Sequence, residues 1–206
     1  MAQAPATSKT RRALMRLAAP AGLAPSLAPR PSEAAALAAR ARPLTRPEAP
    51  EVVFLLPLVG RRHVIDWESV SARLAQTIQS FRRQSSPRWR AVICGQDTPE
   101  DLPDDPRVTF LPFTGLGEGN DKWGKLATLA RALPGLGVQQ GYAMPFDADD
   151  MLAPHVVEEM TGRRVPGGYL VTHGYVLDAA TGHWAMARPQ SPAHPRQKAF
   201  WKLCGS

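Results

Sequence analysis

The chain has 206 residues, a formal charge of +7 and two cysteines, and its length allows one domain with a tail or two small domains. Residues 1–50 hold eight Lys and Arg against two Glu, whereas residues 51–206 hold 17 basic and 16 acidic residues. A nucleic-acid surface needs its cations clustered on a folded face, so this distribution argues against a nucleic-acid partner.

The two cysteines, Cys94 and Cys204, have neither CxxC spacing nor a histidine at metal-ligand spacing, which favours a reduced intracellular compartment. The longest apolar run, "VVFLLPLVG", is well short of the roughly 18 residues that a membrane helix needs. Arg16 and Pro20 interrupt the apolar core that a signal peptide would require. We therefore expect a cytoplasmic protein.

Residues 1–49 are rich in Ala, Pro and Arg and contain no aromatic residue. Such a segment buries too little apolar surface to offset its ordering entropy, so we predict a disordered tail in which "TRRALMRLAA" and "SEAAALAARAR" can form short helices. Its basic charge allows a weak association with an anionic surface, such as the inner face of a membrane. Its Arg-rich, acid-poor composition is also typical of organelle transit peptides.

Ordered structure is predicted to begin at "EVVFLLPLV", residues 51–59, whose continuous apolar character indicates a buried strand. The following segment, residues 66–84, has Asp66 as the N-cap and apolar residues at helical spacing, namely Trp67, Val70, Leu74, Ile78 and Phe81. This strand and helix start a domain that we assign to residues 50–206.

The rest of the domain alternates in the same way. We predict strands over 88–95, 107–113 and 141–146, a helix that starts at Asn120 or Asp121 and stops before Pro134, a helix over 153–161, and two strands within 167–187 joined by an Ala-Thr-Gly turn. Strands that alternate with helices predict an α/β domain with a largely parallel sheet.

Polar side chains follow three of these strands. Arg61, Arg62 and His63 follow the first strand, Asp97 follows the second, and an acidic cluster follows the fourth. Because open parallel sheets bind ligands beyond the carboxyl ends of their strands, these groups are expected to lie on one rim.

The acidic cluster lies in "GYAMPFDADDML", residues 141–152, and consists of Asp147, Asp149 and Asp150. Asp147 and Asp149 can both face one hard cation, and Mg²⁺ or Mn²⁺ bound there would clamp a substrate diphosphate. Asp150 is expected either to cap the next helix or to hold the loop as an outer acceptor.

The acidic cluster has three other possible interpretations. A calcium-binding EF-hand loop requires Gly at the sixth position, where this chain has Leu152. A haloacid-dehalogenase phosphotransferase motif requires Thr or Val at the fifth position, where Met151 stands. An acidic loop that only caps a helix and is solvated stays open as the structural alternative.

The chain resembles bacterial nucleotide-sugar glycosyltransferases of the GT-A fold, family 2 type, in several sequence features that occur in the same order along the chain. The features are "FLLPLV", the helix end "TIQSFRRQS" with its Ser-x-x-x-Gln, the strand "RWRAVICGQD", the helix "DKWGKLATLARAL" and the D-x-D in "YAMPFDADDML". The resemblance covers roughly residues 51–180. It implies a Rossmann-like GT-A sheet flanked by helices and a divalent metal cofactor, Mn²⁺ or Mg²⁺.

The resemblance also implies roles for individual residues. Asp147 would lie near the ribose and diphosphate and share the metal with Asp149. Asp97, or Gln96 beside it, would contact the nucleotide base, and Pro57 with Leu58 would form the wall beside that base.

Other candidates have plainer alternatives. Lys122 and Lys125, one turn apart near a helix N-terminus, can reach a phosphate or simply cover Trp123 with their stems. Trp184 and Trp201 could stack on a sugar, but we expect them to pack in the core.

An inverting transfer needs a carboxylate base near the acceptor hydroxyl, and this chain has no Asp or Glu beyond Asp178. We therefore expect the acceptor-side portion to be largely missing, as in a shortened product or an N-terminal fragment. The first hypothesis is a metal-dependent glycosyltransferase that uses a nucleoside-diphosphate sugar and a glycan or lipid-linked acceptor. The alternatives are a non-catalytic nucleotide-sugar-binding module and, less well matched, a sugar nucleotidyltransferase.

Overall fold

The computed structural model describes residues 7–48, 50–115, 120–189 and 191–194. The chain forms two compact units, residues 1–45 and residues 46–206. In the part of the chain that is described, no helix is both long and apolar enough to cross a lipid bilayer. Trp201 and Cys204 lie outside the described residues.

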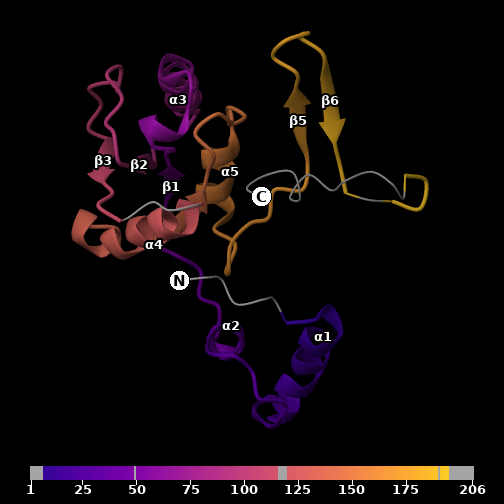
Figure 1. Ribbon diagram of the computed structural model, residues 1–206. Helices are drawn as coiled ribbons and strands as arrows, with labels where there is room; N and C mark the ends of the chain where they lie inside the picture. Colours follow the sequence, from indigo (N-terminus) through magenta and orange to yellow (C-terminus); the bar gives the residue numbers. More distant parts are fainter. Residues whose placement is uncertain (1–6, 49, 116–119, 190, 195–206) are drawn as a thin grey trace. The chain divides into compact units, whose positions relative to one another are not determined.

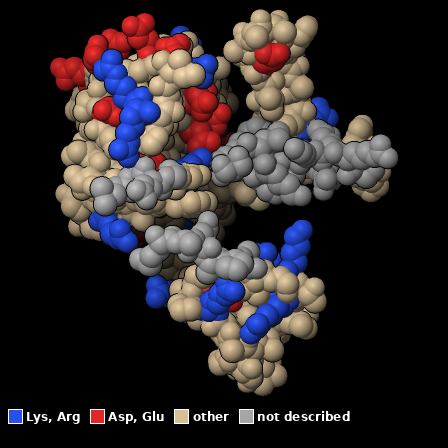
Figure 2. Space-filling model, viewed as in Figure 1, with Lys and Arg blue, Asp and Glu red and all other residues tan. Residues whose placement is uncertain are grey.

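The N-terminal unit contains the two helices that its sequence allows, α1 (Lys9–Ala18) and α2 (Pro31–Ala41), with 3-10 turns η1 (Ala19–Ala21) and η2 (Ala24–Leu27) between them. Ser8 caps α1 by accepting a hydrogen bond from the Arg11 amide, and Met15 is buried. The segment predicted to be a disordered tail therefore has local helical structure. On the face seen in Figure 2, Lys and Arg predominate over acids on this unit.

The second unit is built on a four-stranded sheet with the order β3-β2-β1-β4, in which every neighbouring pair is parallel. Its strands are β1 (Glu51–Pro57), β2 (Trp89–Gly95) and β3 (Val108–Pro112), which Figure 1 labels, and β4 (Gly141–Pro145). The α/β class and the open parallel sheet predicted from the alternating pattern are confirmed.

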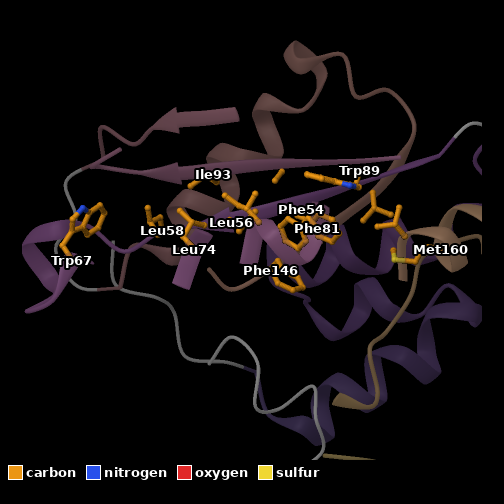
Figure 3. Close-up of a cluster of buried hydrophobic side chains, with 14 residues drawn as sticks. Phe54, Leu56, Leu58, Trp67, Leu74, Phe81, Trp89, Ile93, Phe146 and Met160 are labelled. Atoms are coloured by element: carbon orange, nitrogen blue, oxygen red, sulfur yellow. The ribbon is translucent and has the colours of Figure 1, made fainter. Parts of the chain in front are cut away.

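One face of the sheet packs against α3 (Trp67–Arg82) and α5 (Val156–Arg163). Phe54 of β1 stacks on Phe81 of α3 with ring centroids 4.0 Å apart, and Phe146 meets both rings edge-on (Figure 3). Asp66 caps α3 as predicted, because its carboxylate accepts a hydrogen bond from the Ser69 amide. This face holds the larger hydrophobic core.

The opposite face of the sheet packs against α4 (Lys122–Ala132). Val53 and Leu55, which alternate along β1 with the residues of the larger core, contact this second cluster together with Val92, Cys94 and Leu129. Both faces of β1 are therefore covered, which explains why its sequence is continuously apolar rather than alternating.

The end of the domain differs in detail from its prediction. Helix α5 starts at Val156 rather than at residue 153, and residues 174–187 form an antiparallel hairpin of β5 (Gly174–Leu177) and β6 (Trp184–Ala187). Trp184 is 67% exposed and meets Tyr175 edge-on, so the expectation that it packs in the core is wrong.

Candidate functional site

A pocket of about 420 Å³ opens at the carboxyl ends of β1 and β4. Its apolar wall comes from the end of β1 and from α3, whereas its polar wall comes from the start of α4 and the loop after β4. The lining residues are Pro57, Leu58, Val59, Val64, Val70, Arg73, Asn120, Asp121, Lys122, Lys125, Asp147, Ala148 and Asp149. Its volume falls within the range of small-molecule sites, roughly 300–1,000 Å³.

The position of this pocket follows from the sheet topology. From β1 the chain continues to β2 and β3 on one side, then crosses to place β4 on the other side of β1. The strand order thus reverses between β1 and β4, and a crevice opens at this point because the connections leave in opposite directions. A hydrogen bond of 3.0 Å from the Phe146 amide to the Leu55 carbonyl holds the end of β4 against β1.

Asp147 forms an ion pair with the ammonium group of Lys122 in this pocket. Lys122 Nζ donates to Asp147 Oδ1 at 2.7 Å, and the side chains of both residues are partly exposed, by 24% and 29%. A lysine in this position offsets the charge of the acidic cluster and presents positive charge to an anion in the pocket.

Asp149 and Asp150 complete the acidic cluster. Asp149 lines the pocket, and no described residue donates a hydrogen bond to its carboxylate or pairs with it. Asp150 is exposed as a residue, yet burial of its carboxyl group and the charges of Asp147 and Asp149 raise its pKa. Because α5 has His155 as its N-cap, Asp150 does not cap that helix, and this alternative is wrong.

The cluster offers only part of a metal coordination sphere. Among the described residues, no three His, Cys, Asp or Glu side chains are grouped so that they could hold a metal ion. Two carboxylates, Asp147 and Asp149, nevertheless line one pocket. This set fits Mg²⁺ or Mn²⁺, which take one or two protein carboxylates and complete their shell with phosphate and water oxygens. It does not fit an ion that needs a closed protein cage.

Lys125, predicted to reach a phosphate, belongs to the pocket wall but is almost completely buried. Its side chain is 1% exposed, and Nζ donates to the Leu58 carbonyl at 2.6 Å and to Asp121 Oδ1 at 2.9 Å. Burial raises the pKa of Asp121, but the hydrogen bonds from Lys125 and Gln96 outweigh burial and leave that pKa lowered. The Lys125–Asp121 pair therefore ties α4 to the end of β1.

The residues after β2 lie next to the pocket rather than in its lining. Asp97 Oδ2 accepts a hydrogen bond of 2.8 Å from the Arg61 amide, which joins the loop after β2 to the turn η3 (Arg61–His63) after β1. Gln96 donates to Asp121, while its Oε1 is buried and has no hydrogen-bond partner among the described residues. The predicted contact of Asp97 or Gln96 with a nucleotide base stays a prediction.

The carboxylate nearest the end of the chain has a local role. Asp178 lies in the β5–β6 turn, where it accepts hydrogen bonds from the Ala180 amide and the Thr181 hydroxyl. These bonds lower its pKa, the Thr181 hydroxyl most strongly. Asp178 is thus engaged in holding the turn.

Several residues of the pocket were not predicted from the sequence as site residues, among them Asp121 and two residues of α3. Arg73 and Val70 reach it from α3, one turn apart. Their place in the site can be recognised only once β1 and α3 are known to flank the same crevice, because a lone Arg on an amphipathic helix is usually a solvated surface residue.

No protein-family model matches the chain, and no curated protein matches it either.

Proposed function

We propose that the pocket binds a nucleoside-diphosphate sugar together with Mn²⁺ or Mg²⁺, and that the domain is the donor half of an inverting glycosyltransferase. The observation that carries this proposal is the placement of Asp147 and Asp149 in one pocket at the reversal point of a parallel sheet. Crevices of this kind bind nucleotides in many open α/β folds.

The pocket wall divides into two chemical halves that suit such a ligand. Pro57, Leu58, Val64 and Val70 offer an apolar surface for the flat face of a base and ribose. Opposite them, Lys122 and the exposed Arg73 supply positive charge for a diphosphate, and Asp147 and Asp149 supply carboxylate oxygens for a hard cation.

The divalent ion would supply charge neutralisation for the departing nucleoside diphosphate. The chain's own groups bind and orient the donor: the carboxylates hold the ion, and Lys122 is within reach of both Asp147 and an anion beside it. Transfer to a glycan or lipid-linked acceptor also needs a base for the acceptor hydroxyl.

A second candidate function is a nucleotide-sugar-binding module without transferase activity. Of the three carboxylates in the pocket lining, Asp121 is bonded to Lys125 and Gln96, and Asp147 is bonded to Lys122. Among the described residues, only Asp149 has no such partner, and the proposal uses it, with Asp147, to bind the metal. The described pocket therefore supports donor binding more directly than it supports acceptor activation.

For the place of action we propose the cytoplasm, with weak association at the inner membrane face through the N-terminal unit. Leu14 and Leu17 of α1 are 52% and 78% exposed, beside the basic side chains of Lys9, Arg12 and Arg16. Exposed apolar side chains next to Lys and Arg suit an anionic lipid surface.

Thermal unfolding with a panel of nucleoside diphosphates, with and without Mn²⁺, tests the donor-binding proposal. At a ligand concentration about a hundredfold above Kd, binding adds about 2.7 kcal/mol and raises Tm by roughly 5–10 °C. Asp149→Asn should abolish the Mn²⁺-dependent part. The control Glu159→Gln, on the exposed surface of α5, should preserve it. If the nucleotide raised Tm equally with and without Mn²⁺, donor binding would not depend on the metal, and the proposed metal role would be wrong.

A further inference from the structure

The loop that carries the acidic cluster is fastened to α3 by a buried hydroxyl group. Thr77 is fully buried, and its Oγ1 donates to the carbonyl oxygens of Ala148 at 3.0 Å and Asp150 at 2.8 Å. These two carbonyls flank Asp149 in the chain. A single side chain from α3 therefore holds the backbone on both sides of the residue predicted to bind a metal.

The same loop is closed by its own backbone. The Asp150 amide donates to the Asp147 carbonyl at 3.2 Å, which makes residues 147–150 a tight turn. Ala148, between the two aspartates, packs against the larger core. Asp147 and Asp149 line the pocket together with part of Ala148, so the anchored turn lies in the pocket wall with both aspartates.

Ser80 on α3 and Gln84, two residues beyond the end of α3, continue this attachment along the loop. Ser80 Oγ accepts from the Leu152 amide at 3.1 Å, and Gln84 donates to the Ala153 carbonyl at 2.8 Å. Gln84 Oε1 also accepts from the Val157 amide at 3.1 Å, at the start of α5. Thr77 and Ser80 lie one turn apart on the buried face of α3, beside the core residues Ile78 and Phe81, and Gln84 follows the end of the helix. The end of α3 and Gln84 just after it therefore fix the loop.

We infer that Thr77 is a positioning residue for the divalent cation: its hydroxyl sets the turn that holds Asp147 and Asp149 at the separation the ion requires. This inference rests on the proposed metal-dependent donor site. Groups behind metal ligands orient those ligands, and their loss typically lowers metal affinity about 10- to 100-fold. Thr77 touches neither the ion nor the substrate and acts only through the loop backbone.

The test compares Mn²⁺ affinity, measured by electron paramagnetic resonance of the free ion, in full-length variants of matched shape. Thr77→Val keeps the volume and removes the donor, whereas Thr77→Ser keeps the donor. Thr161→Val is the control, because Thr161 is an equally buried threonine whose hydroxyl donates to Val157 within its own helix. Thermal unfolding of each variant ensures that binding is measured on folded protein.

Thr77→Val should weaken Mn²⁺ binding about tenfold or more. Thr77→Ser and Thr161→Val should stay within about twofold of the wild type. Equal Mn²⁺ affinity in Thr77→Val and the wild type would overturn the positioning role, as would equal weakening in Thr161→Val.

If Thr77→Val does not fold, Ser80→Ala provides the second measurement, because it loosens the same loop at Leu152 and should weaken Mn²⁺ binding in the same direction. Unchanged affinity in Ser80→Ala would then overturn the inference. A different result would contradict the proposed function. In that case the wild type would show no saturable Mn²⁺ binding, or its binding would be unaffected by Asp149→Asn.

Discussion

Lys122 and Asp147 form an ion pair of 2.7 Å on the polar wall of the pocket at the ends of β1 and β4. The pair has two opposing consequences for ligands. In the proposed donor site, the ammonium group would compete with a divalent ion for the Asp147 carboxylate and would also attract the phosphates of a nucleotide. One substitution can therefore separate metal binding from anion binding.

Replacing Lys122 by methionine should change the two affinities in opposite directions. Mn²⁺ alone should bind about fivefold more tightly, because a partly exposed ion pair worth about 1 kcal/mol no longer competes. A nucleoside diphosphate without metal should bind more weakly by a similar factor. Isothermal titration of Lys122→Met, with Arg131→Gln on the exposed surface of α4 as control, measures both. If both affinities moved in the same direction, Lys122 would not have this double role.

Lys125→Met should act on stability rather than on ligand contact. Removing the buried ammonium leaves the Leu58 carbonyl without its donor and Asp121 with Gln96 alone, and breaking such a buried pair typically costs about 3–5 kcal/mol of unfolding free energy. Urea unfolding measures this cost, and the double variant Lys125→Met/Asp121→Asn should recover part of it. A fully stable Lys125→Met that has lost diphosphate binding would instead support the phosphate contact predicted from the sequence.

The contrast between these two lysines shows where sequence reasoning stops. Their spacing places both near the start of α4, and either can reach a phosphate by that criterion alone. Both line the pocket, but the Lys122 side chain is 24% exposed and the Lys125 side chain only 1%. The difference depends on how α4 packs on the sheet, where Leu129 is buried in the second cluster. Asp121, four residues before Lys125, forms the pair that keeps Lys125 buried.

The sheet was easier to predict than the support of the acidic loop. Apolar runs such as residues 51–57 identify strands locally, and the parallel arrangement follows from their alternation with helices. Thr77 lies on an apolar helix face, where a polar residue indicates a buried hydrogen bond. Its partners Ala148 and Asp150, however, are some 70 residues away in the chain. Such a long-range contact between a side chain and a backbone leaves no periodic pattern in the sequence.

Asp105 should give the second unit a defined acid sensitivity. Its side chain is 5% exposed, and a hydrogen-bonded ion pair with Arg107, assisted by Arg82, lowers its pKa to about 2. Because the folded-state pKa is below the unfolded one, this contribution is fully present above about pH 5 and is lost as the pH falls toward 2.

The unfolding free energies of wild type and Asp105→Asn should therefore differ by about 2 kcal/mol at pH 7 and converge as the pH falls from about 5 to 2. Urea unfolding across this range measures the difference, with Asp104→Asn at the exposed neighbouring position as control. A difference that does not change with pH would assign the stability to packing rather than to the charge of Asp105.

The most direct measurement of the metal-dependent donor site is an anomalous difference map from crystals grown with Mn²⁺ and a nucleoside diphosphate. We predict one strong manganese peak about 2.0–2.2 Å from carboxylate oxygens of Asp149 and Asp147, with phosphate oxygens completing its coordination. Manganese bound elsewhere, or a nucleotide lying outside the pocket between β1 and α4, would contradict the account.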